Sequence, residues 1–248
     1  MLGVIPARLG SERLPRKPLQ LLAGRPLVEW VWKRVVGFAV LDHVVVATDS
    51  EEVAGICYGF GADVELTAES HRTGTERVAE VAARAVYEAF DVVVNVQGDE
   101  PFVAEEHVFE AVRMVRTGHD IGTVAAPVAT LEAWRDLSVV KIARAANGRA
   151  LFFSRAPIPH PRGGIPSEKD LLSPAYLRHI GVYAYSRAAL MQWVALPETE
   201  LERIEKLEQL RPLAAGMSIG VAIVAAAEGG IDTPEDLERA TLLFKERA

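Results

Sequence analysis

Apolar runs and helical patterns alternate through the first half of the chain. Short apolar runs rich in β-branched residues predict strands over 2–6, 44–48, 64–66, 92–96 and 121–128. The stretches between them predict helices over 26–38, 51–58, 75–89 and 105–116. The helix over 75–89 is expected to bury one face, made of Val78, Val81, Ala82, Ala85 and Val86. This alternation predicts an α/β fold with a Rossmann-like, mostly parallel sheet and helices on both faces.

The pattern changes after about Val140. Asn147-Gly148 predicts a turn, and the five prolines and two glycines of Pro157–Pro174 exclude a long helix or a central strand. We expect this segment to be an inserted excursion of loop and strand. Regular elements then resume as a strand over 180–185, a helix over 201–213, a strand over 219–225 and a helix over 233–245. The chain is predicted to form one domain over 1–248, with a distinct subregion at about 140–190.

Composition narrows the class of protein. Half of the 248 residues are hydrophobic, which is enough for a full core without disulfides. The single cysteine, Cys57, cannot form an internal disulfide, and its helical surroundings predict a small core residue. No apolar stretch approaches the ~20 residues that span a bilayer, so a soluble cytoplasmic protein without a membrane partner is expected. The net charge of −7 argues against a nucleic-acid partner.

A basic loop, residues 7–19, follows the first predicted strand. It contains Arg8, Arg13, Arg16 and Lys17 against the single acid Glu12, a net charge of +3 in an acidic chain. An arbitrary run of this kind is more often a solvated turn. After the first strand of an α/β sheet, however, backbone N–H groups and basic side chains converge on phosphates. The loop is therefore predicted to bind a phosphate-bearing ligand.

Asp99 follows directly after the predicted strand over 92–96. Its position predicts a carboxylate at the ligand edge of the sheet, next to the basic loop if the two strands are neighbours. Carboxylate oxygens suit Mg²⁺, which takes few protein ligands. The alternative is a cap for the helix over 105–116.

Two further segments have the pattern of a helix start. Thr233 and Asp236 form a capping-box pattern with Pro234 at the first helical position, which leaves Asp232 without a capping role. In His71–Arg77, Gly74 permits a close backbone approach and Thr75 is expected to cap the helix that follows.

Several motifs together resemble one enzyme family. The loop pattern Ile5-Pro6-Ala7-Arg8-x-x-Ser11-x-Arg13-Leu14-Pro15-x-Lys17-Pro18-Leu19 looks like the signature of the sugar-activating cytidylyltransferases. The chain is most similar to the 3-deoxy-manno-octulosonate (Kdo) cytidylyltransferases, or CMP-Kdo synthetases. The other segments that agree are 70–77, 94–101, 151–162, 177–185, 204–211 and 230–239. Departures occur at Thr73 and Glu76, and at Arg16, where the family commonly has glycine.

The resemblance implies a nucleotide-diphospho-sugar transferase type of fold and roles for individual residues. It implies nucleotide binding by Arg8, Ser11, Arg13, Lys17, Thr73, Gly74 and Gln97. It implies binding of the acidic sugar by Gln97, Arg162, His179, Tyr183, Glu208 and Gln209. Asp232 would be the second Mg²⁺ ligand beside Asp99, and both aspartates with Lys17 would form the catalytic set.

The implied reaction is transfer of CMP from CTP to Kdo, with release of pyrophosphate, for lipopolysaccharide synthesis. The implied protein is a homodimeric, Mg²⁺-dependent nucleotidyltransferase. A related acidic sugar, sialic acid or an amino variant of Kdo, is the nearer alternative. A non-catalytic nucleotide-binding protein is the farther one. The sequence lacks a Walker A motif, a complete G-x-G-x-x-G, H-E-x-x-H and G-x-S-x-G.

Overall fold

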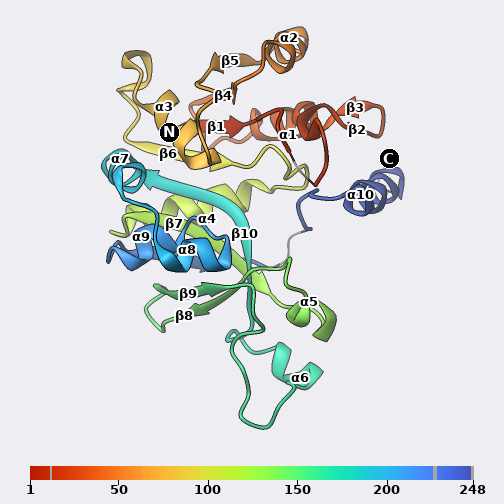
Figure 1. Ribbon diagram of the computed structural model, residues 1–248, viewed down its shortest axis with the longest axis vertical. Helices are drawn as coiled ribbons and strands as arrows, with labels where there is room; N and C mark the ends of the chain where they lie inside the picture. Colours follow the sequence, from red (N-terminus) through yellow and green to blue (C-terminus); the bar gives the residue numbers. More distant parts are fainter. Residues whose placement is uncertain (12, 226–227, 247–248) are drawn as a thin grey trace. The chain divides into compact units, whose positions relative to one another are not determined.

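The computed structural model describes residues 1–11, 13–225 and 228–246, so Glu12 of the basic loop lies outside the described residues. The chain divides into two compact units (Figure 1). Unit 1 consists of Met1–Glu105 with Glu228–Ala248, and unit 2 consists of Glu106–Ala227. One domain over 1–248 stays a prediction.

Unit 1 is built around parallel strands in the order β6-β1-β4-β5. Its elements are β1 (Leu2–Pro6), the 3-10 turn η1 (Lys17–Leu19), β2 (Leu21–Leu22), β3 (Arg25–Pro26), α1 (Leu27–Val35), β4 (His43–Thr48), α2 (Glu51–Gly59), β5 (Asp63–Leu66), α3 (Gly74–Ala82), the 3-10 turn η2 (Ala85–Tyr87), β6 (Val92–Val96) and α10 (Pro234–Glu246). The predicted strands of this region are confirmed, with ends that differ by no more than one residue.

The strand order reverses between β1 and β6. The chain runs outward from β1 through β4 to β5 and then returns to β6 on the other side of β1. Because such crossovers are right-handed, α1 and α2 cover one face and α3 covers the other, as predicted. The carboxyl ends of β1 and β6 therefore lie side by side at a topological switch point, where open α/β sheets bind ligands.

A hydrophobic cluster holds α10 in unit 1. Ile231 and Ala240 pack with Leu14 of the basic loop and with Leu27, the first residue of α1. Phe244 contacts the ring of Trp30 with centroids 4.6 Å apart. Figure 1 shows α10, in blue, beside the β2–β3 hairpin. Apolar burial thus ties the end of the chain to its beginning and positions the residue after Ile231, which is Asp232.

The helix predicted over 75–89 is shorter in the structure. Val78, Val81 and Ala82 are buried as expected, but α3 ends at Ala82, and Val86 in η2 is exposed. The helix stops because the backbone of Arg84 is extended, with φ −71° and ψ 140°. Arg84 forms ion pairs with Glu65 and Glu80, which hold the turn. The amphipathic pattern past residue 82 was therefore misread.

Unit 2 combines parallel and antiparallel strands. Its elements are α4 (Glu105–Arg116, which begins at the unit boundary), β7 (Ile121–Pro127), α5 (Leu131–Arg135), β8 (Lys141–Arg144), β9 (Ala150–Ser154), α6 (Glu168–Leu171), β10 (Leu177–Ser186), α7 (Arg187–Ala195), α8 (Glu200–Glu205), α9 (Leu210–Ala214) and β11 (Ile219–Ile223). β11 runs parallel to β7, β10 runs antiparallel to β7, and β8 pairs with both β10 and β9. The hairpin β8–β9 and the helix α7 were not predicted.

The excursion behaves as its prolines predicted. Asn147-Gly148 lies in the turn between β8 and β9. The segment Pro157–Pro174 holds only one turn of helix, α6, and Figure 1 shows it extending away from the β8–β9 hairpin. Leu171 packs with Trp134 and Tyr176 and anchors the far part of the excursion to α5.

The helix predicted over 201–213 is interrupted. Lys206 has φ 55°, a left-handed conformation that ends α8 before α9 begins. A buried ion pair joins the two short helices, with Glu202 accepting from Arg211 at 2.6 and 2.8 Å. The break places Glu208 and Gln209 in the corner between the helices instead of on a helix face.

Two predictions about composition can be compared with the structure. Cys57 is fully buried, and burial raises the pKa of its thiol to about 12, so it is a core residue as predicted. In the part of the chain that the structure describes, no helix has the length and apolar character needed to cross a membrane.

Candidate active site

Lys17 joins the two acids that are candidate metal ligands. Its ammonium donates to Oδ1 of Asp232 at 2.7 Å and to Oδ2 of Asp99. Asp99 follows β6, Lys17 begins η1, and Asp232 precedes α10. The backbone N–H of Ile231 donates to the Asp99 carbonyl at 2.9 Å, which holds the two acidic segments together. The structure thus brings three of the predicted residues to one point beyond the ends of β1 and β6.

The charges at this point stabilise one another. Burial lowers the pKa of Lys17, but the carboxylates of Asp99 and Asp232 outweigh burial, so the net pKa is raised and the ammonium stays charged. Burial raises the pKa of Asp232, yet Lys17 and Arg13 lower it further, so its carboxylate stays ionised. Arg13 contributes through an ion pair of 2.8 Å with Asp232. Two cations of the basic loop therefore converge on one candidate metal ligand.

Neither Asp232 nor Asp99 is used as a helix cap in the structure. Thr233 and Asp236 form the capping box of α10, with hydrogen bonds of 3.0 and 3.2 Å, and Pro234 is the first helical residue. This leaves the Asp232 carboxylate to Lys17 and Arg13. Asp99 lies six positions before α4, and its carboxylate binds Lys17, which disfavours the helix-cap alternative.

A divalent cation fits the donors found here. Asp99 and Asp232 supply hard carboxylate oxygens, and both already converge on a cation, the Lys17 ammonium. Among the described residues no group of three or more His, Cys, Asp or Glu side chains could enclose a metal. Two carboxylates are nonetheless the usual protein share for Mg²⁺, which is otherwise bound by phosphate and water.

Arg8 and Ser11 are the other residues of the basic loop that were predicted to bind the nucleotide. Arg8 is exposed, and Ser11 accepts a hydrogen bond from the Leu14 N–H at 3.4 Å. The start of the loop is tied to β4, because Ala7 N–H donates to the Ala47 carbonyl at 2.8 Å.

The start of α3 lies beside the end of β6. Thr73, not Thr75, is the helix cap, with its hydroxyl accepting from Glu76 N–H at 3.2 Å while Glu76 returns the bond. A Cβ on Gly74 would stand 3.6 Å from Oε1 of Gln97. Gly74 and Gln97, both predicted to bind the nucleotide, are therefore neighbours. The prediction that Thr75 caps the helix was wrong, because the capping geometry begins two residues earlier.

Gly98 lies where the end of β6 passes close to the end of β1, and a side chain there would clash with the backbone. A Cβ at this position would stand 2.7 Å from the carbonyl oxygen of Pro6, closer than atoms of this kind approach. Only glycine lets the end of β6 pass so near the end of β1. The close approach keeps Asp99 next to the basic loop.

In unit 2, three of the residues predicted for the sugar lie together. The rings of His179 and Tyr183 on β10 have centroids 5.1 Å apart, and His179 Nε2 lies 3.0 Å from the Thr123 hydroxyl. Burial lowers the pKa of His179 to about 3, so its ring is neutral near pH 7. Burial raises the pKa of Tyr183 well above its usual value, and the nearby charge of Glu208 adds to this. Within the described residues, the buried Tyr183 hydroxyl has no hydrogen-bond partner.

The other predicted sugar residues differ in exposure. Gln209 is buried at the start of α9, and Arg162 is exposed on the excursion. Another arginine, Arg155 just before the excursion, binds backbone and donates to the carbonyls of Glu205 at 2.8 Å and Leu137 at 3.1 Å. No contact joins Arg162 to Tyr183 among the interactions described for unit 2.

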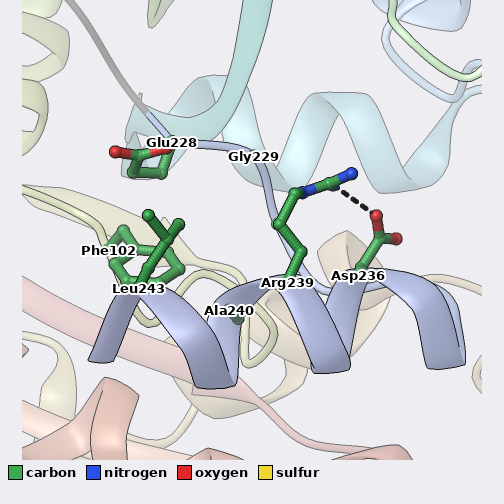
Figure 2. Close-up of a pocket in the computed structure, with 8 residues that line it drawn as sticks. Phe102, Glu228, Gly229, Asp236, Arg239, Ala240 and Leu243 are labelled. Atoms are coloured by element: carbon green, nitrogen blue, oxygen red, sulfur yellow. Dashed lines mark hydrogen bonds and ion pairs between the residues drawn. The ribbon is translucent and has the colours of Figure 1, made fainter. Parts of the chain in front are cut away.

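A small pocket lies along α10 in unit 1. Figure 2 shows Phe102 and Leu243 at one end and the ion pair of Arg239 with Asp236 at the other. None of the predicted substrate residues lines it. We therefore assign it no part in the chemistry.

Comparison with known proteins identifies the family. The family model for cytidylyltransferases matches residues 2–219. A 3-deoxy-manno-octulosonate cytidylyltransferase from Gemmatimonas aurantiaca is 54% identical over 97% of this chain and 92% of its own length. Another from Syntrophotalea carbinolica is 44% identical over 96% and 95%. The chain belongs to the 3-deoxy-manno-octulosonate cytidylyltransferase family.

Solved structures agree with this assignment. A structure of CMP:2-keto-3-deoxy-manno-octonic acid synthetase in complex with CTP is 35% identical, covers 100% of this chain and 99% of its own, and superposes with a TM-score of 0.89. A 4-diphosphocytidyl-2C-methyl-D-erythritol synthase from Anaerococcus prevotii shares only the fold, with 15% identity, coverage of 98% and 97%, and a TM-score of 0.61. The predicted fold class is confirmed.

The backbone conformation at Arg16 explains why glycine would suit this position. Its φ of 55° and ψ of 35° are left-handed, a conformation that glycine adopts without strain. The family resemblance implies glycine at this position. Here the arginine forms an ion pair with Glu52 of α2, which gives the side chain a surface partner.

Sequence reasoning missed two features of the site. It assigned Lys17 and Arg13 to the nucleotide, with Lys17 also in the catalytic set, but it did not predict that both cations bind Asp232. It also missed Thr123, the partner of His179 on the neighbouring strand β7. The positive charge of the loop signals an acidic partner in general, but it does not identify which acid.

Proposed function

We propose that this chain transfers CMP from CTP to 3-deoxy-D-manno-octulosonate, forming CMP-Kdo and pyrophosphate. The observation that carries the proposal is the meeting of Lys17, Asp99 and Asp232 beyond the switch point of a parallel sheet. A cation held between two acids at that edge suits a triphosphate and its counter-ions. The names of the relatives support the choice of sugar.

The basic loop would bind the triphosphate. Arg8 is exposed for this role, and Lys17 and Arg13 carry charge at the ends of β1 and β6. The Ser11 hydroxyl, which accepts from Leu14, has its proton available for a phosphate oxygen. Thr73, Gly74 and Gln97 would lie at the nucleoside end.

The reaction is an in-line displacement at the α-phosphorus. The anomeric hydroxyl oxygen of Kdo forms the new P–O bond, the bond to the bridging oxygen of pyrophosphate breaks, and the hydroxyl proton passes to solvent. Positioning and neutralisation of charge supply most of the catalysis in such transfers. Lys17 and Arg13 would neutralise the charge that develops on the departing pyrophosphate.

Asp99 and Asp232 would hold Mg²⁺. When bound, the ion would supply Lewis-acid polarisation of phosphate oxygens and a lowered pKa of the attacking hydroxyl. The two carboxylates contribute negative charge and hard oxygen donors, and the ionised state of Asp232 supports this role. Lys17 would then interact with phosphate.

The residues of unit 2 would recognise the sugar. Arg162 suits the carboxylate, since a guanidinium binds it in a bidentate manner. Neutral His179, the Tyr183 hydroxyl, Glu208 and Gln209 suit the hydroxyl groups of an octulosonate. The Tyr183 hydroxyl is buried without a hydrogen-bond partner in the described part of the chain, which supports a ligand partner at this place.

The deciding experiment is an assay of pyrophosphate release with CTP, Mg²⁺ and a panel of acidic sugars. Kdo is expected to give the highest kcat/KM, with sialic acid and an amino variant of Kdo as competitors. A higher value for either competitor would reassign the sugar. Pyrophosphate release with none of the three, by folded protein that binds CTP, would favour the non-catalytic alternative.

We also propose a cytoplasmic homodimer that acts in lipopolysaccharide synthesis. Support for the dimer comes from the excursion, where Ile165 and Leu172 are exposed apolar side chains, Leu172 by 82%. Light scattering coupled to size-exclusion chromatography tests the oligomer. Leu172→Glu is expected to shift the mass toward that of one chain if this segment forms the interface.

A further inference from the structure

Arg77 is a buried cation at the edge of the site in unit 1. Arg77 lies on α3 and only 1% of the residue is exposed. Its Nη2 lies 2.8 Å from Oδ2 of Asp49. The other arm of the guanidinium donates to the Thr67 hydroxyl. A charge in such a position is retained only with partners of this kind, so Asp49 and Thr67 determine where Arg77 lies.

Asp49 connects this buried pair to the basic loop. Oδ2 binds Arg77, while Oδ1 accepts from the backbone N–H of Leu9 at 3.3 Å. A second link runs beside it, because the Thr48 hydroxyl donates to the Ala7 carbonyl at 2.7 Å. The two links hold residues 7 and 9, on either side of Arg8.

Thr67 connects the two links to each other. The Thr67 backbone N–H and hydroxyl both bind the Thr48 carbonyl, at 2.9 and 3.0 Å, and the Thr67 hydroxyl in turn accepts from Arg77. Strand β4, the residue after β5 and helix α3 therefore form one hydrogen-bonded support under the first residues of the loop. Such a support is rigid because each buried polar group in it has a partner.

We propose that Asp49 and Arg77 are positioning residues for the triphosphate, acting through the backbone of the basic loop. The inference rests on the proposed function of that loop. Without the ion pair, residues 7–9 would sample more conformations, and ordering them on binding would weaken affinity for the ligand. Arg77 thereby belongs to the support of the phosphate loop, whereas the family resemblance implies nucleotide binding only for Thr73 and Gly74 of the same segment.

The test measures pyrophosphate and CTP affinity by calorimetry in Asp49→Asn, which keeps the size of the side chain and removes its charge. Pyrophosphate affinity is expected to fall about tenfold, while the KM for Kdo changes little. Arg77→Lys keeps the positive charge, so its loss of pyrophosphate affinity is expected to be smaller than that of Asp49→Asn. The matched control is Glu202→Gln, which breaks the buried pair with Arg211 in unit 2. The control is expected to lower stability without changing pyrophosphate affinity.

The outcomes separate this inference from the proposed function. Wild-type pyrophosphate affinity in folded Asp49→Asn, with affinity lost in Lys17→Ala, would overturn the inference alone. Unchanged affinity in both variants would overturn the proposed function of the loop. If Asp49→Asn does not fold, Thr48→Val removes the parallel link to Ala7 at constant shape. Loss of pyrophosphate affinity in Thr48→Val then supports the inference, and unchanged affinity contradicts it.

Discussion

The Nζ of Lys17 lies 2.7 Å from Oδ1 of Asp232, although 215 positions separate the two residues in the chain. A residue of the first loop thus contacts a residue that precedes the last helix. The same ammonium binds Asp99 after β6. The contact makes the phosphate-binding and metal-binding predictions depend on one cluster, because a metal on the two carboxylates requires Lys17 to interact elsewhere.

The aspartates should be needed for turnover. Asp99→Asn and Asp232→Asn keep size and remove charge, and each is expected to lower kcat about a hundredfold or more if the carboxylates position the metal. Steady-state kinetics at saturating Mg²⁺ measures this. Asp63→Asn, at an exposed acid of β5, serves as the control. Near-normal rates in both site variants would remove the metal assignment.

Lys17 should act on phosphate. Lys17→Ala is expected to weaken CTP and pyrophosphate binding alike, and the wild-type affinity should fall as salt rises, because charge attraction is screened. Calorimetric titration of both ligands at several salt concentrations measures this. If CTP affinity fell while pyrophosphate affinity stayed the same, Lys17 would have to be assigned to the nucleoside end.

Arg162 should select for the sugar carboxylate. Arg162→Lys keeps the charge but loses the bidentate geometry, and the KM for Kdo is expected to rise about tenfold, since a charge-assisted contact is worth roughly 1.5–3 kcal/mol. The KM for CTP should stay nearly constant. An unchanged KM for Kdo would make Arg162 an ordinary exposed residue of the excursion. Arg155 would be a weak replacement, because its guanidinium already binds backbone carbonyls.

His179 should make stability depend on pH. Its folded pKa of about 3 lies below the unfolded value of about 6.5. Below about pH 6.5 the unfolded chain therefore binds a proton that the folded protein does not. As the pH is lowered through this region, the free energy of unfolding falls by at most about 1.4 kcal/mol per pH unit. Above about pH 6.5 the ring is neutral in both states, so His179 does not make stability depend on pH. Urea unfolding of wild type and His179→Gln, at pH values from roughly 7.5, above the pH-dependent region, to roughly 4.5, within it, measures the difference. Parallel curves would contradict the shift.

The backbone at Arg16 should favour glycine. Arg16→Gly and Arg16→Ala both remove the exposed ion pair with Glu52, but only glycine adopts φ 55° freely. The glycine variant is therefore expected to be more stable than the alanine variant by about 1 kcal/mol. Thermal unfolding of the two proteins measures this difference. Equal stabilities would mean that residue 16 is not held in the left-handed conformation.

Local patterns were reliable where one force decided the outcome. The continuous apolar run of β6 and the amphipathic helix α4 were predicted with the bounds that they have, since burial of a complete strand or face leaves little choice. Two predicted helices were too long: the one over 75–89, where α3 ends at Ala82, and the one over 201–213, which is divided into α8 and α9. There, ion pairs of Arg84 and the left-handed Lys206 ended the helices, and helical periodicity does not record either cause.

The sequence by itself determined the alternation of strands and helices, the basic loop after the first strand, and an acid at the end of β6. It also determined the family through its motifs. Only the tertiary structure decided that Asp99 and Asp232 share Lys17, and that Asp49 and Arg77 support the loop. The physical reason is distance along the chain: strand and helix preferences act over a few neighbours, whereas these contacts depend on strand order and on the apolar packing of α10 against the first third of unit 1.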